Sequence, residues 1–195
     1  KEKLSAGARD AAMAKITTGL DYAALGSANM VIEAATENLE LKLKILQQVG
    51  GHVGKDAIVA TNTSSISITQ LGAVLLAPDR FIGIHFFNPV PVMSLLEVIR
   101  GVQTSDATHA ATMDFARTVG KSPITVRNSP GFVVNRILCP MINEAIFVLQ
   151  EGLASAEDVD AGMRLGCNHP IGPLALADMI GLDTLLSIMR VLYDE

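Results

Sequence analysis

The order of apolar and polar positions in the first two thirds of the chain predicts alternating strands and helices. Met30–Ala35 is a short apolar run that fits a buried strand, and Leu39–Val49 places leucines at helical spacing. Gly50 and Gly51 are expected to end that helix. A second buried strand is predicted over Ala57–Thr61. A strand, a helix and a strand within about thirty residues indicate a βαβ unit, which requires a parallel sheet with a right-handed crossover.

The same alternation continues up to residue 127. A polar turn after the second strand leads into a short helix, for which Ser67 is the expected N-cap. The remaining predicted elements are strands at Phe81–Phe86, Leu95–Ile99 and Ile124–Val126, and a helix over Thr104–Val119 that Gly120 ends.

From Ser129 onward the pattern is helical only. A long apolar helix precedes Gly152, and Pro140 inside it predicts a kink. The segment Ser155–Asp158 fits a capping box that opens another helix, and two further helical segments follow it. We therefore predict an α/β domain over residues 1–127, followed by an all-helical domain over residues 128–195.

Composition and charge narrow the classes of protein. Apolar residues make up 49% of the chain and charged residues 18%, which argues against disorder. A net charge of −5 offers no basic surface to nucleic acid or to an anionic membrane, and no apolar run approaches a membrane span of roughly 18 residues. Cys139 and Cys167 form no CxxC pair, which favours a reduced intracellular protein. Cys167 and His169 lack a second pair of ligands, so we expect no metal site and interpret both as structural or solvated.

Polar residues collect where the predicted strands end. Thr36, Glu37 and Asn38 follow the first strand, residues 61–65 (Thr-Asn-Thr-Ser-Ser) follow the second, and His85 lies at the end of the third. Ligands of open parallel sheets bind outside the carboxyl ends of the strands. These positions therefore predict the site of function.

His85 has a candidate partner in the next predicted strand. A hairpin centred on Pro91 places His85 opposite Glu97. Cross-strand partners have Cα atoms roughly 4.5–5.5 Å apart, so a carboxylate can reach the imidazole. Such a contact would fix the tautomer of the ring and stabilise its protonated form, and a histidine held in this way can accept a proton from an alcohol.

From the residues alone, a less specific interpretation stays open beside each functional one. His85 is either a catalytic base or a hydrogen-bonded core residue, and the Ser/Thr cluster is either a ligand site or a helix-capping turn. Glu37 and Lys42 also fit a solvated helix start and face. Asn135 lies in an apolar helix, where a helix–helix hydrogen bond would satisfy its amide.

Several motifs, in the same order and spacing, resemble the NAD-dependent L-3-hydroxyacyl-CoA dehydrogenase family, in particular its bacterial 3-hydroxybutyryl-CoA branch. They are "EAATENLELK", "ATNTSSISI", "IGIHFFNPVPVMSLLEVI", "SPGFVVNRIL" and "HPIGPLALADMIGLDT". The resemblance implies a Rossmann-like NAD-binding domain and an all-helical domain. It also implies reversible oxidation of a 3-hydroxyacyl-CoA to the 3-ketoacyl-CoA with hydride transfer to NAD⁺, a reaction of fatty acid β-oxidation.

Roles for individual residues follow from the same resemblance. It implies that His85 is the general base, that Glu97 orients it, and that Asn135 and Ser64 hold the oxygens of the substrate. Asn88 is implied to line the nicotinamide site.

The cofactor and the assembly are implied in the same way. Glu37 and Lys42 resemble cofactor contacts, together with Ser64. The helical domain corresponds to the dimerisation region of the family, so a homodimer is expected.

One departure from the family pattern leaves alternatives open. The family begins with a G-x-G-x-x-G turn between a strand and a helix, and this chain has no such turn, because Gly50 and Gly51 follow a helix. We therefore expect a chain that starts inside the NAD-binding domain and stops before the end of the helical one. The alternatives are a non-catalytic structural or CoA-binding relative, and a dehydrogenase of another 3-hydroxy acid on a similar fold.

Overall fold

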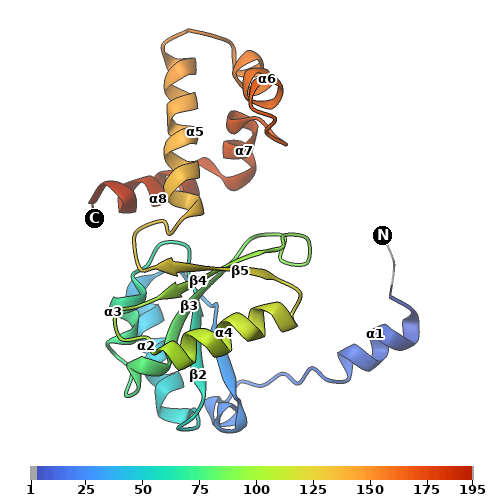
Figure 1. The fold of residues 1–195 in the computed structure, drawn as a ribbon, viewed down its shortest axis with the longest axis vertical. Helices are drawn as coiled ribbons and strands as arrows, with labels where there is room; N and C mark the ends of the chain where they lie inside the picture. The colour runs from blue at the N-terminus through green and yellow to red at the C-terminus, as the bar shows by residue number, and fades with distance from the viewer. Residues whose placement is uncertain (1–3, 195) are drawn as a thin grey trace.

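A computed structural model describes residues 4–194 and shows a sheet with helices on both faces beneath a separate group of helices (Figure 1). The sheet has the order β1-β2-β3-β4-β5. Its strands are β1 (Met30–Glu33), β2 (Ile58–Asn62), β3 (Phe81–Phe86), β4 (Leu95–Arg100) and β5 (Ser122–Arg127). The first three are mutually parallel, β4 is antiparallel to β3, and β5 is parallel to β4.

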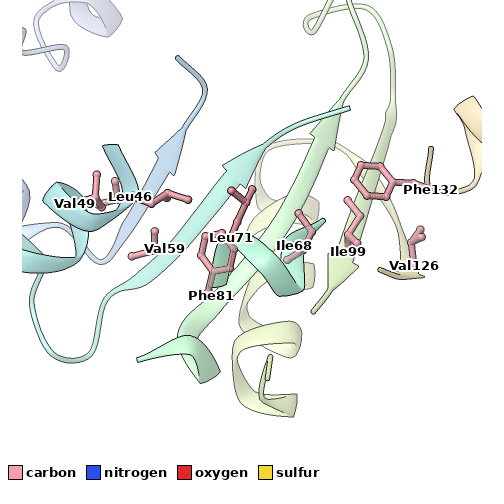
Figure 2. Packing of buried hydrophobic residues seen from close by; sticks show 10 residues of the cluster. Leu46, Val49, Val59, Ile68, Leu71, Phe81, Ile99, Val126 and Phe132 are labelled. Atoms are coloured by element: carbon pink, nitrogen blue, oxygen red, sulfur yellow. The ribbon is translucent and has the colours of Figure 1, made fainter. Parts of the chain in front are cut away.

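Helices pack on both faces of the sheet because side chains alternate along each strand. On one face lie α2 (Leu39–His52) and α3 (Ile68–Gly72), and on the other lies α4 (Asp106–Thr118). Figure 2 shows the first of these cores, built from Val31, Leu46, Val49, Val59, Ile68, Leu71, Phe81, Ile99, Val126 and Phe132. The second core consists of Ala60, Ile82, Ile84, Leu96, Val98 and Ala116. Neighbours such as Phe81 and Ile82 thus point to opposite faces, as the period of a strand requires.

The segment before β1 lies at the side of this domain. Helix α1 (Ala6–Met13) projects away from the sheet and contributes no buried residue (Figure 1). A 3-10 helix at Tyr22–Ser27 follows it and packs on α2. A second 3-10 helix, Pro78–Arg80, leads directly into β3.

The helices above the sheet have a small core of their own. They are α5 (Val134–Gln150), α6 (Ala156–Gly166), α7 (Pro173–Ile180) and α8 (Leu182–Asp194). The buried residues of this core are Cys139, Ile142, Ala177 and Leu185. Within residues 4–194, we find no helix whose length and apolar character would let it cross a membrane.

The elements expected from the pattern are confirmed, with shifts at their ends. The βαβ unit is parallel, Ser67 caps α3 by accepting from the N–H of Gln70, and no strand follows β5 in the described part of the chain. The expectation that Gly50 and Gly51 end α2 is wrong, because the helix continues to His52. A β-carbon on Gly50 would lie 2.8 Å from Cδ2 of Leu75, so a larger residue at this position would require the Leu75 side chain to move. Helix α5 runs through Pro140.

Candidate active site

The predicted pairing of His85 with Glu97 is confirmed. The two residues are direct partners in the antiparallel β3–β4 register, and His85 Nδ1 lies 2.7 Å from Glu97 Oε2. The side chains are buried, with 5% of His85 and none of Glu97 exposed. A carboxylate only accepts hydrogen bonds, so it selects the tautomer with the proton on Nδ1 and leaves the lone pair on Nε2.

The free nitrogen of His85 faces Ser64. Ser64 Oγ lies 3.2 Å from Nε2 and therefore donates to it. The rings of Phe87 and Phe132 flank the imidazole, with centroids 4.5 and 5.7 Å away. An apolar enclosure of this kind excludes water from the sides of the ring, so Nε2 is the polar atom of the ring that remains beside Ser64.

The second oxygen of Glu97 holds the start of α5. Glu97 Oε1 accepts from the backbone N–H groups of Val133 and Val134, each at 3.0 Å. The carboxylate therefore has hydrogen-bond partners on both oxygens. Helix α5 also carries Asn135 in its first turn, and Asn135 Nδ2 lies 3.5 Å from the carbonyl oxygen of Ser64.

Glu37 connects two of the polar turns at the carboxyl edge of the sheet. Its Oε2 accepts from Thr63 Oγ1 at 2.7 Å, and its Oε1 accepts from the N–H of Ser64 at 3.0 Å. Asn62 Oδ1 accepts from the N–H of Phe86 at 3.1 Å and so links the ends of β2 and β3. The Glu37 carboxylate is itself exposed, so its remaining lone pairs are available to a ligand.

Lys42 lies beneath this edge. It has no exposed surface, and its Nζ is 2.5 Å from Glu33 Oε2 and 3.3 Å from Thr61 Oγ1. Burial acts to raise the pKa of Glu33, but hydrogen bonds from Lys42, Thr61 and the N–H of Ala35, with the charge of Lys42, hold it below its ordinary value. The ammonium group is therefore saturated within the fold.

The structure thus brings five of the predicted site residues together. Direct contacts join them in the order Glu97, His85, Ser64 and then Glu37 and Asn135. Lys42 is separate, behind the strand ends. Asn88 is exposed just beyond β3.

Sequence reasoning missed the residues that support this group. Phe87 and Phe132 flank His85, and the N–H groups at the start of α5 bind Glu97, yet apolar residues in apolar segments give no signal of either contact. The pairing of Glu33 with Lys42 had a signal: each is a charged residue at a core-facing position of its element.

A cleft opens next to Ser64. It has a volume of about 630 Å³ and is lined by Glu37 and the Ser64–Ser67 turn on one side and by Asp183, Thr184 and Ser187 of α8 on the other. Ligand pockets commonly measure about 300–1,000 Å³, so this cleft is large enough for part of a coenzyme-sized ligand.

The parallel β1–β3 edge with its polar turns, next to a buried His–Glu pair and a helical second part, defines a Rossmann-like protein of the nucleotide-binding class. Residues 1–129 match the family model described as 3-hydroxyacyl-CoA dehydrogenase, NAD binding domain, and residues 131–195 match 3-hydroxyacyl-CoA dehydrogenase, C-terminal domain. The chain belongs to the 3-hydroxyacyl-CoA dehydrogenase family.

Individual relatives agree with this assignment. The chain is 49% identical over 194 residues to the 3-hydroxybutyryl-CoA dehydrogenase of Bradyrhizobium diazoefficiens, covering 100% of this chain and 66% of that protein. It is 46% identical over 183 residues to the enzyme of the same name from Clostridioides difficile, covering 94% and 65%. The crystal structure of (S)-3-hydroxybutyryl-CoA dehydrogenase from Ralstonia eutropha is similar with a TM-score of 0.96 and 64% identity, covering 98% and 68%. The chain therefore spans about two thirds of the length of these relatives.

Proposed function

We propose that this chain carries the catalytic residues of an NAD-dependent oxidoreductase. The proposed reaction interconverts an (S)-3-hydroxyacyl-CoA, with 3-hydroxybutyryl-CoA as the favoured substrate, and the corresponding 3-ketoacyl-CoA, a step of fatty acid β-oxidation. The observation that carries the proposal is the His85–Glu97 contact of 2.7 Å, with Nε2 of His85 left to a hydroxyl group. The names of the relatives support the choice of substrate.

In the proposed mechanism, His85 removes the proton of the substrate hydroxyl. The hydroxyl donates to Nε2, and as the proton moves to the ring, Glu97 stabilises the imidazolium from the opposite side. Ser64 Oγ and Asn135 Nδ2 then donate to the substrate oxygen, on which negative charge develops. A bound NAD⁺ would supply the acceptor for the hydride that leaves the carbon bearing this oxygen.

The residues present fit one half of the cofactor. Glu37 offers exposed carboxylate lone pairs to ribose hydroxyls beside Ser64, and Asn88 lies next to the strand that carries His85. We propose these as the contacts of the nicotinamide half. Lys42 is hydrogen-bonded to Glu33 at the end of β1. In this proposal, Lys42 does not contact the cofactor and instead stabilises the strand ends that bind it. No Gly-rich phosphate-binding turn is present in residues 1–195.

We assign the roles of the two domains in the same proposal. Residues 1–127 are the cofactor domain with the catalytic histidine, and residues 128–195 form the substrate and dimerisation domain. Exposed apolar side chains on the helices, among them Phe147, Leu165 and Met179, support a homodimer formed through them. Two free cysteines and bacterial relatives support a cytoplasmic location.

Replacing His85 with glutamine tests the proposed reaction. Glutamine retains a polar group of similar reach but accepts no proton, so the rate of NADH oxidation with acetoacetyl-CoA should fall by about 10²–10⁴-fold while the fold is kept. His109→Gln is the matched control, because His109 lies on α4 and, among the described residues, its side chain bonds Thr125 and no group of the candidate site. An unchanged rate in H85Q would exclude His85 as the base. Binding of an acyl-CoA with no turnover by the unmodified protein would favour a non-catalytic relative instead.

A further inference from the structure

We propose that the first turn of α5 is a positioning element for His85 and acts on it through Glu97. The catalytic meaning of this inference rests on the proposed function, in which His85 is the base. The structural coupling itself can be measured without turnover.

Helix α5 begins without a cap of its own. Its N-cap residue, Val133, makes no side-chain hydrogen bond to the helix start, and residues 129–132 (Ser-Pro-Gly-Phe) supply none. Helices normally satisfy their first N–H groups with a nearby Ser, Thr, Asp or Asn. Here Glu97, 36 residues before Val133, performs that task from the middle of β4.

Glu97 is therefore shared between the helix and the imidazole. One oxygen accepts two N–H groups at 3.0 Å, and the other lies 2.7 Å from His85 Nδ1. Because Glu97 is fully buried, water does not compete for either oxygen. The partial positive charge of the helix N-terminus also attracts the carboxylate. Contacts with α5 on one side and with His85 on the other therefore fix the plane of the Glu97 carboxylate, and this plane in turn orients the imidazole ring of His85.

The chain just before α5 adopts an unusual backbone that delivers these N–H groups. Gly131 has φ of +69° and Phe132 has φ of +52°, a region that bulky residues rarely occupy. Phe132 is 3% exposed, and its ring meets that of His85 edge-on. Such conformations persist where the surrounding structure enforces them, commonly at functional sites.

The same turn also sets Asn135. Because Asn135 lies one residue after Val134, any shift of the helix start moves its amide relative to Ser64 together with the N–H groups that hold Glu97. A change in the position of α5 relative to the sheet would therefore alter the orientation of His85 and the position of the Asn135 amide together. Val133 and Val134 are positioning residues in this scheme, since only their backbone acts and only through Glu97.

Removing one N–H group tests the coupling directly. Replacing Val134 with α-hydroxyisovaleric acid exchanges its backbone N–H for an ester oxygen and leaves the side chain unchanged. The N–H of Val134 has no partner inside the helix, so the helix ladder loses no donor. The same replacement at Val148, in the last turn of α5 and far from Glu97, is the control.

The readout is the proton between His85 Nδ1 and Glu97, followed by NMR in protein with ¹⁵N-labelled histidine. With one donor fewer, Glu97 accepts more strongly from His85, so this resonance should move downfield in the Val134 ester and stay in place in the Val148 ester. We also expect kcat to fall about three- to tenfold with little change in KM, the effect of one hydrogen bond. An unmoved resonance in the Val134 ester would overturn the proposal. Absence of turnover in the unmodified protein would count against the proposed function alone.

Glu97→Gln provides a second measurement of the same coupling. An amide has a single oxygen, which must serve either the two N–H groups of α5 or His85. If the helix positions this side chain, the oxygen stays with α5 and the amide nitrogen faces Nδ1, which shifts the ring proton to Nε2. The ¹⁵N shifts of His85 report that tautomer. Retention of the proton on Nδ1 would show that the helix does not control the side chain.

Discussion

At the scale of the residue, Lys42 and Glu33 form the most deeply buried ion pair of the described chain. Neither side chain is more than a few per cent exposed, and Thr61 completes their hydrogen bonds. Removing one partner of such a pair leaves an uncompensated buried charge, which typically costs about 3–5 kcal/mol. The pair therefore governs the stability of the strand ends that carry the polar turns.

The depressed pKa of Glu33 predicts a loss of stability in acid. Unfolding returns this carboxyl group to its ordinary value near 4.5. Below that value the unfolded chain binds a proton that the folded protein does not, so stability is retained above this pH and lost as pH falls through the lower folded value. Urea unfolding between neutral pH and about pH 3 should show this fall in the free energy of unfolding. In Glu33→Gln, the free energy of unfolding should depend less steeply on pH.

The stability of Glu33→Gln at neutral pH can also be predicted and compared with that of a control variant. Glu33→Gln should destabilise the protein by about 3–5 kcal/mol, because it leaves Lys42 buried without its partner. Asp114→Asn removes the exposed partner of Arg117 and should change stability by less than about 1 kcal/mol. Equal slopes for wild type and E33Q in acid would refute the assignment of the transition to Glu33.

Individual residues differ in how far the sequence could predict their roles. The His85–Glu97 contact was predictable because a hairpin fixes cross-strand partners over only twelve residues. The contact of Phe132 with His85 was not, because it depends on positive φ angles at Gly131 and Phe132 and on a helix that arrives from another domain. The burial of Lys42 was open to prediction but was missed, because Lys42 shares one face of α2 with Leu46 and Val49, four and seven residues later.

At the scale of the element, the turn that leads into α5 requires glycine at position 131. A β-carbon on Gly131 would lie 3.0 Å from the backbone N of Arg136 and 2.9 Å from Cδ2 of Leu192, in addition to the strain of a φ of +69°. Two separate costs therefore apply at this position, a conformational one and a steric one.

Gly131→Ala and Gly120→Ala separate these two costs. Gly120 has φ of +75° but no atom within 4 Å of the added β-carbon. Gly120→Ala should cost about 1–2 kcal/mol from strain alone. Gly131→Ala should cost at least about 1 kcal/mol more, since the backbone N of Arg136 cannot yield as a flexible side chain could. Chemical unfolding of both variants measures the difference, and equal costs would mean that the turn relaxes freely.

At the scale of the whole molecule, the change from alternating strands and helices to helices alone was predictable from the pattern, and the contacts between these two parts were not. The switch from alternating strand and helix signals to helices only occurs near the end of β5, as the structure has it. The packing of α5 on Glu97 and of α8 beside Ser64 joins positions far apart in the sequence. Periodicity reports which face of an element is buried and carries no information on which element covers it.

The proposed dimer predicts a particle of about twice the chain mass of 20.6 kDa in light scattering. Leu165 on α6 is 86% exposed, and Leu165→Glu should shift the protein toward the monomer. Leu76 in the α/β domain is 94% exposed, so Leu76→Glu is the control that should leave the mass unchanged. A monomeric mass for the unmodified protein would refute the dimer.

The antiparallel step from β3 to β4 has a consequence for how the protein avoids misassembly. A slip of the hairpin by one residue would turn every side chain of β4 to the opposite face, and a slip by two would place Leu95 or Ile99 opposite His85. Either error would bury the Glu97 carboxylate without its histidine, at the cost of an unpaired charge. The pair that we propose for proton transfer therefore also helps to fix the register of β3 and β4. A chain with these strands misaligned would be less stable than the native fold and would be poorly populated.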